Sequence, residues 1–197
     1  MILSGLSQYI QLPKTEFRWS INKAAENLKL PFFHIMIQQF LYNQLYPDSK
    51  IPSSQLEITV YPDFNGRISI FYCASATFHA PSDISGVNGM HHEFIQATPS
   101  WRQGAPQYDC IYINSAGESE GMPGLEITRV MAFFAIVHDE VEYQCALVHG
   151  FSHEGTKPND VTGLWVMEPE SDGDGNPSLD IVHLDSIYCA AHLLPVF

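Results

Sequence analysis

The feature that most constrains the fold is the change of pattern at Ile51. From there on, the chain consists of short runs of β-branched and aromatic residues separated by Gly, Pro, Asn and Asp. Such runs are typical of half-buried strands joined by turns. The clearest pair, Leu56–Tyr61 and Arg67–Tyr72, flanks the Asn-Gly turn signal in Pro62–Gly66 and is therefore predicted to form a hairpin.

Further strands are predicted along the rest of the chain. They are Ala74–Phe78, Tyr108–Ile113, Leu125–Val137, Glu142–Phe151, Gly163–Met167 and Leu179–Leu184, with a turn at His138–Glu140 and one helical turn at Asp185–Ala191. The stretches Phe78–Trp101 and Ser115–Gly124 are predicted to be loops. About eight short strands at this spacing predict an antiparallel barrel or a strongly bent sheet.

Helical periodicity is confined to the first 50 residues. Ser20–Leu28 combines a serine cap with strong helix formers, and Pro31–Tyr46 repeats apolar residues at helical spacing. The predicted fold class is therefore α+β, mainly β. We expect an N-terminal helical extension at residues 1–50 and an antiparallel β domain at residues 51–197.

The charge is unevenly distributed along the chain. Residues 1–50 contain five Lys or Arg and three acids, which gives +2. Residues 51–197 contain four and nineteen, which gives −15 and a total of −13. Because nonspecific nucleic-acid binding rests on clustered Lys and Arg, this balance disfavours a nucleic-acid partner. A basic partner fits better, although acidity also keeps a domain soluble.

The cysteines and the apolar runs bear on the compartment. Four cysteines lie far apart in apolar surroundings and form no CxxC pair, so we expect buried, reduced thiols at Cys73, Cys110, Cys145 and Cys189. The first residues do not resemble a secretory signal, and no run approaches the roughly 18 apolar residues of a membrane span. We therefore expect an intracellular protein, nuclear or cytoplasmic, with no membrane contact.

Chemistry-bearing residues concentrate between residues 78 and 101. The residue types that bind zinc, manganese or another first-row metal are present there as His79, Asp83, His91, His92 and Glu93. Their spacing matches no HExxH motif, and adjacent histidines on a strand point to opposite faces. Two interpretations stay open: a metal site on an irregular backbone, or a loop whose histidines form local hydrogen bonds. Asp83, which follows Pro81-Ser82, is typical of a turn or helix cap.

Two acidic groups in the last third of the chain also invite a functional interpretation. Asp172–Asn176 alternates like the first half of an EF-hand loop, but Pro177 and His183 stand where that loop needs Gly and Glu, so a hairpin turn is predicted. Glu168 and Glu170 are a pair of carboxylates of the kind used in sugar hydrolysis. An ordinary strand end is the alternative for this pair.

Several segments, in order, carry a family resemblance. They are Phe40–Asp48, Ala80–Gly86, Ala97–Trp101, Tyr108–Cys110, Arg129–Val130 with Phe133–Phe134, Cys145–His149 with Phe151, Thr162–Val166, Val182–Ile187 and Ala190–Val196. With these segments, about three-quarters of the chain resembles the C-terminal region of large proteins encoded by fungal DNA transposons of the Plavaka and KDZ type, found in mushroom-forming fungi.

The resemblance implies an accessory module that lies beyond the nuclease core of such proteins and has no assigned chemistry. The chain departs from the family pattern at several positions. Basic residues are common in the family where this chain has His91, His92, Phe94 and Gln96, and a Trp stands at the position of Gly150. The loss of these charges weakens any nucleic-acid role.

Our first hypothesis is a noncatalytic binding module. It would hold a protein or nucleic-acid partner through the 78–101 and 115–124 loops, as part of a larger transposon-related assembly, with binding residues Asp83, Trp101, Arg102 and Trp165. The alternative is a metal-assisted hydrolase or nuclease, with His79, His91 and His92 as metal ligands and His92, Glu93 and Asp109 as catalytic residues. A third possibility is homo-oligomerisation through the amphipathic helix and the apolar C-terminal tail.

Overall fold

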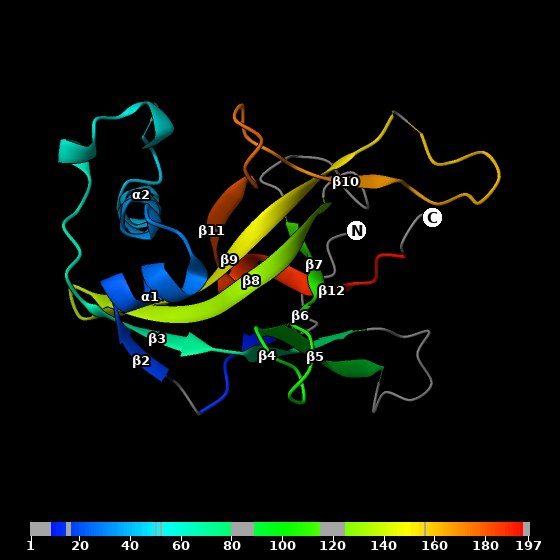
Figure 1. Cartoon of the computed structure of the whole chain (residues 1–197), viewed down its shortest axis with the longest axis horizontal. Coiled ribbons are helices and arrows are strands. Elements are labelled where there is room, and N and C mark those ends of the chain that lie inside the picture. The colour runs from blue at the N-terminus through cyan, green and yellow to red at the C-terminus, as the bar shows by residue number, and fades with distance from the viewer. Residues whose placement is uncertain are drawn as a thin grey trace.

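The computed structural model describes residues 9–14, 17–49, 51, 53–79, 89–114, 125–155 and 157–194 (Figure 1). Its strands are β1 (Tyr9–Gln11), β2 (Phe17–Ser20), β3 (Arg67–Phe71), β4 (Cys73–His79), β5 (Met90–Thr98), β6 (Gln107–Tyr108), β7 (Cys110–Asn114), β8 (Leu125–His138), β9 (Val141–His153), β10 (Met167–Pro169), β11 (Leu179–His183) and β12 (Ile187–Ala191). Its helices are α1 (Ile21–Leu28) and α2 (Phe33–Leu45), with 3₁₀ turns η1 (Ser53–Gln55), η2 (Ile58–Val60) and η4 (Leu184–Ser186).

The described strands form two open antiparallel sheets. The small sheet has the order β1-β4-β5-β6. The large sheet runs β10-β9-β8-β3-β2, with β11 beside β9, β7 beside β8 and β12 beside β7. The prediction of a mainly β, antiparallel fold is confirmed. The described strands do not close into a barrel, because β1 and β6 end the small sheet while β2 and β10 end the main path of the large one.

The long hairpin β8–β9 is the centre of the molecule. Its two-residue turn consists of Asp139 and Glu140, with φ of 48° and 65°, and it joins His138 directly to Val141 in the ladder. Positive φ at both central residues is the geometry that matches the twist of a hairpin. A register shift between Val130 and Ala132 interrupts the ladder, and β8 curves visibly in Figure 1. The predicted turn and its two strands are confirmed.

Both faces of the middle part of this hairpin are buried, which explains the nearly continuous apolar sequence there. Phe134 belongs to a cluster that includes Phe33 and Ile37 of α2, and the rings of Phe33 and Phe134 meet edge to face at 5.6 Å. Phe133 belongs to a second cluster, with Ala76 and Ile95 of the small sheet among its members. In Figure 1 the helices accordingly lie on one side of β8 and β9 and the small sheet on the other.

The first 50 residues share this core. α1 begins after Ser20, whose side chain accepts a hydrogen bond from the backbone N–H of Lys23, and α2 buries Phe33, Ile37, Phe40 and Leu41. β1 pairs with β4, and β2 pairs with β3. The described part of residues 1–50, which we expected to form a helical extension, thus supplies both helices and two strands, and it packs against the same two hydrophobic clusters as residues 51–197.

Several local predictions are wrong. The alternating Leu56–Tyr61 is not a strand: Ile58 and Val60, at 58% and 51% exposure, lie in η2, and the partners of β3 are β2 and β8. The hydroxyl of Tyr61 donates to the carbonyl of Ser53 at 2.6 Å, which fixes the segment as a turn. Within Gly163–Met167 only the last residue lies in a strand, β10. The predicted helical turn at Asp185–Ala191 is a short η4 followed by β12.

Candidate functional site

The residues that suggested metal chemistry lie on a regular hairpin, β4–β5. The stretch Phe78–Trp101 is therefore not one irregular loop: β4 continues to His79 and β5 begins at Met90. Residues 80–88, which include Asp83, and the predicted 115–124 loop lie outside the described residues. Because strand residues alternate between faces, His91 and His92 project to opposite sides of the small sheet.

His92 lies on the outer face of the small sheet, where it is exposed. Its partner in the ladder is Thr77, and Nδ1 of His92 lies 2.9 Å from Oγ1 of Thr77. The imidazole also meets the ring of Phe94 edge to face at 5.1 Å. His79 lies on the same face, paired with Met90 rather than with His92. The local hydrogen bonding that we considered for the histidines is thus present at His92.

His91 and Glu93 lie on the inner face. The ring of His91 is 5.3 Å from the ring of Phe78, which in turn lies 6.4 Å from Tyr188 of β12. Oε1 of Glu93 accepts a hydrogen bond from the backbone N–H of Ala190 at 2.6 Å. Across the described part of the chain, no three His, Cys, Asp or Glu side chains are placed to hold one metal ion.

Glu93 also acts on a neighbouring thiol. Burial raises the pKa of Cys189 to about 11, and the negative charge of Glu93 contributes to the rise. Burial likewise raises the pKa of Cys73 and Cys145. The four cysteines are free, as the apolar surroundings predict, and their thiols are poor nucleophiles near neutral pH.

Asp109, the third candidate catalytic residue, stands between β6 and β7. One carboxylate oxygen, Oδ2, accepts the backbone N–H of Gln96 at 2.7 Å, and Oδ1 accepts from Nε2 of Gln107 at 3.0 Å. Its backbone carbonyl accepts the N–H of Val130 on β8 at 3.0 Å. Asp109 therefore connects β5, β6 and β8 at the point where the chain passes from the small sheet to the large one.

Trp101 and Arg102 come together on the β5–β6 turn. The guanidinium carbon of Arg102 lies 5.3 Å from the centre of the Trp101 ring, which is 39% exposed. Arg102 and Gln103 have φ of 49° and 63°, a region that costs energy for residues other than Gly and that clusters at functional positions. In Figure 1 this turn projects from the small sheet on the side away from the helices.

Trp165 does not belong to this surface. It lies on the connection between β9 and β10, where its ring meets that of His153 at 4.7 Å. Figure 1 shows this connection extending beyond the ends of β9 and β10, away from the small sheet. The structure thus separates Trp165 from Trp101 and Arg102.

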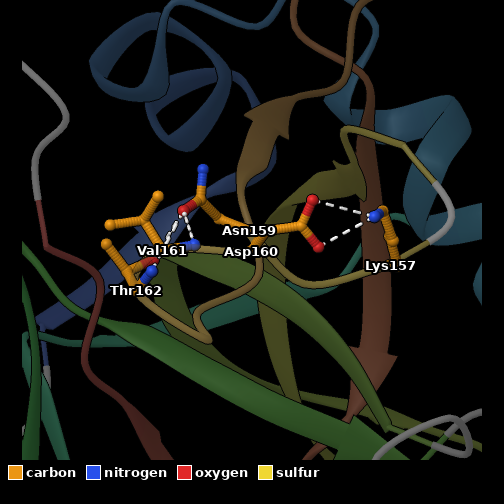
Figure 2. A network of polar contacts seen from close by, with 5 residues as sticks. All are labelled: Lys157, Asn159, Asp160, Val161 and Thr162. Atoms are coloured by element: carbon orange, nitrogen blue, oxygen red, sulfur yellow. Dashed lines mark hydrogen bonds and ion pairs between the residues drawn. The ribbon is translucent and has the colours of Figure 1, made fainter.

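Local polar contacts hold the β9–β10 connection (Figure 2). Nζ of Lys157 donates to both carboxylate oxygens of Asp160, at 2.8 and 2.9 Å. Oδ1 of Asn159 accepts the backbone N–H groups of Val161 and Thr162, both at 3.0 Å. The bonds to Asn159 form an Asx-type turn that satisfies backbone N–H groups of this exposed loop.

The outer face of the small sheet is the surface on which the most exposed aromatic side chains of this region gather. In the ladder, Tyr9 is opposite Thr77, which is opposite His92, and Gln11 is opposite Ser75, which is opposite Phe94. Tyr9 is 46% exposed and Phe94 is 63% exposed. None of these six side chains carries a fixed charge. We call this set, together with the Trp101–Arg102 turn, the outer face.

Sequence reasoning missed Tyr9, Thr77 and Phe94. A signal was available, because His92, Phe94 and Gln96 alternate with Glu93 and Ile95 in a regular strand pattern. The Gly, Pro and Asn residues just before them favoured a loop over the whole stretch. Tyr9 could not be assigned, because its place beside Thr77 depends on pairing across 68 residues of chain.

The Asp172–Asn176 segment is the predicted turn. Oδ1 of Asp172 accepts the backbone N–H groups of Asp174 and Asn176, at 3.0 and 2.8 Å, and an isolated bridge joins Ser171 to Pro177. These hydrogen bonds, led by those from Asn176, lower the pKa of the Asp172 carboxyl.

Comparison with protein-family models, with curated proteins and with solved structures gives no match. Among the described residues, no helix is both long enough and apolar enough to cross a membrane. The resemblance to the transposon proteins therefore stays an expectation from the sequence, and the outer face is the candidate functional site.

Proposed function

We propose that the protein is a noncatalytic module that binds another protein on its outer face. The observation that carries this proposal is an exposed, uncharged, aromatic sheet face in a chain with a net charge of −13. Aromatic side chains supply large contact area at protein interfaces, and charged residues are depleted at interface centres. The resemblance to transposon proteins suggests that the partner is a component of a larger transposon-related assembly.

The environment of the candidate catalytic residues supports a binding role over catalysis. Glu93 is engaged by the N–H of Ala190, and Asp109 is engaged by Gln96 and Gln107. A carboxylate that accepts hydrogen bonds from another strand joins the two strands, and this is a structural role. Together these contacts hold the hairpin whose other side is the outer face.

The charge of the outer face favours protein over nucleic acid. Sheet faces that bind single-stranded nucleic acid combine stacked aromatic rings with Lys and Arg that follow the phosphates. Here the described outer face offers one such cation, Arg102, at its rim, and the remainder of residues 51–197 is strongly acidic. A phosphate backbone would be repelled, whereas a neutral or basic protein surface would not.

Photocrosslinking tests this proposal. The photoreactive amino acid p-benzoylphenylalanine is introduced at Phe94 or, as a control, at Val137 on β8, which is 56% exposed. In extract of cells that express the protein, we expect a discrete protein adduct from position 94 and none from position 137. Excess unlabelled wild-type protein should abolish the adduct, and the double variant Tyr9→Ser, Phe94→Ser should not.

Absence of any adduct at position 94, the same adducts from position 137, or equal competition by the double variant would each show that the outer face is not a specific docking surface. Thermal unfolding of the double variant within a few degrees of wild type establishes that it competes as a folded protein.

A further inference from the structure

A second surface lies at the far end of the large sheet. Three exposed glutamates project there from one face, where β8, β9 and β10 lie side by side: Glu126, Glu168 and Glu170. Glu168 is opposite Ser152 in the ladder, and Glu126 is opposite Ile113. Within the described part of the chain, none of the three carboxylates pairs with a Lys, Arg or His.

A buried hydroxyl lies on the same strand face as these acids. Thr128 is two residues from Glu126 on β8 and directly opposite Gly150 on β9, so all three positions share one face. Thr128 is only 4% exposed, and its Oγ1 has no hydrogen-bond partner. A buried hydroxyl without a partner is unfavourable, so a ligand group that donates a hydrogen bond there would be favoured.

Glu170 is held in place over Gly150, the residue that is paired with Thr128. Its backbone N–H donates to the carbonyl of Gly150 at 2.9 Å, and its own carbonyl accepts from Ser178 N–H at 3.0 Å and lies 2.7 Å from Nε2 of His149. Its side chain lies over Gly150: a Cβ added to that glycine would be 2.6 Å from Oε2. The missing side chain of Gly150 therefore provides the space in which the Glu170 carboxylate rests.

The nearby cations are turned away or already paired. Arg129 follows Thr128 on β8 and thus points to the opposite face, where its guanidinium carbon lies 5.1 Å from the ring centre of Phe151. Lys157, on the β9–β10 connection, is paired with Asp160 (Figure 2). The negative charge of the three glutamates is therefore not balanced by either residue.

We propose that this acidic face binds a lysine- or arginine-bearing peptide segment of a protein partner. Charge complementarity selects a cation, and Glu168 and Glu170 would receive it from the solvent side. When the cation draws the Glu170 carboxylate off Gly150, the hydroxyl of Thr128 becomes able to accept an N–H from the same ligand. This surface is separate from the outer face. A negative result for binding at one of the two surfaces would therefore leave the proposal for the other surface unchanged.

Fluorescence anisotropy with labelled hexalysine in 150 mM NaCl tests the proposal. The double variant Glu168→Gln, Glu170→Gln removes two charges from the face. The matched control Asp139→Asn, Glu140→Gln removes two charges from the turn at the other end of the hairpin. We expect the first pair to weaken binding about fivefold, as for two exposed ion pairs, and the control pair less than twofold.

A third variant changes the geometry without changing the charge. Gly150→Ala places a methyl group where the Glu170 carboxylate rests. The Glu170 side chain is flexible and can move away at little cost in stability. Because binding draws the Glu170 carboxylate off Gly150, a methyl group there favours the displaced position, and we expect tighter peptide binding in Gly150→Ala with an unchanged melting temperature. This variant carries the test if the double glutamine variant does not fold.

Three results would overturn the proposal. Equal weakening by the two charge-matched pairs would show attraction to diffuse acidity alone. No binding in 150 mM NaCl would show that the face has no useful affinity for a basic segment. Displacement of the peptide by 1 mM CaCl₂, with calcium binding that the Glu168/Glu170 variant loses, would identify a metal-ion site in its place.

Discussion

Glu93 on β5 and Ala190 on β12 are joined by a hydrogen bond of 2.6 Å, although 97 residues separate them in the sequence. Ala190 is paired in the ladder with Ile111 of β7. The backbone N–H of Ala190 nevertheless donates its hydrogen bond to the Glu93 carboxylate of the other sheet. This bond therefore ties the small sheet to the edge of the large one.

Replacement of Glu93 should destabilise the fold. Glu93→Ala leaves the N–H of Ala190 without its acceptor, and we expect a loss of about 1–3 kcal/mol in the free energy of unfolding, measured in urea. Glu93→Gln keeps an acceptor oxygen and should lose less. Because the Glu93 charge helps to raise the pKa of Cys189, Glu93→Gln should also lower that pKa from about 11, as followed by the pH dependence of iodoacetamide labelling. Wild-type values in both measurements would contradict the assignment.

Thr128→Val should stabilise the protein. The hydroxyl of Thr128 is buried without a partner, and valine has nearly the same shape, so we expect a gain of about 1 kcal/mol in the free energy of unfolding. Thr98→Val is the matched control. Thr98 is 7% exposed, but its hydroxyl bonds to the backbone of Ser100, so its replacement should cost about 1 kcal/mol. Changes of the same sign in both variants would refute the explanation.

The Asp172 turn should loosen in acid. Hydrogen bonds from the backbone of Asn176 and Asp174 lower the pKa of Asp172 in the folded protein. The contribution of these bonds is therefore fully present above the unfolded pKa of about 4 and is lost as the pH falls through the lowered folded pKa. The amide proton shifts of Asp174 and Asn176 should change together over this range. Asp172→Asn should remove the transition, and its persistence in that variant would assign it to another carboxyl.

The β8–β9 turn offers a stabilising substitution. Asp139 and Glu140 both have positive φ, and Asp-Gly is a favoured pair for such a turn. Glu140→Gly should therefore raise the free energy of unfolding by about 1 kcal/mol. Glu142→Gly, two residues later on β9, should lower it, because glycine weakens a strand. A loss of stability in Glu140→Gly would mean that the turn has a different backbone in solution.

Local patterns predicted much of the secondary structure. The serine cap and helical spacing located α1 and α2, and the apolar runs located β8 and β9, because these signals act within a few residues. The same reasoning was wrong at Leu56–Tyr61, where the alternation of Ile58 and Val60 meets solvent rather than a neighbouring strand. A period of two predicts a strand only if a partner covers one face.

The candidate site likewise contains some contacts that are local in the sequence and others that join distant parts of the chain. Trp101 and Arg102 are neighbours in the chain, and their contact follows from the turn that contains them. The roles of Glu93 and Asp109 depend on Ala190 and Gln96, which the sequence gives no means to select. For this reason, residue types that suggested chemistry could not be distinguished from residues that join strands.

By itself the sequence determined a mainly β, acidic chain with two helices near its start, because period, capping and charge are local properties. Only the tertiary structure decided that Tyr9, Thr77 and His92 form one row on the outer face, that Thr128 is opposite Gly150, and that Glu170 lies over Gly150. Strand order and register are set by the packing of both faces of β8 and β9, a choice made by the whole core and not by any segment of it.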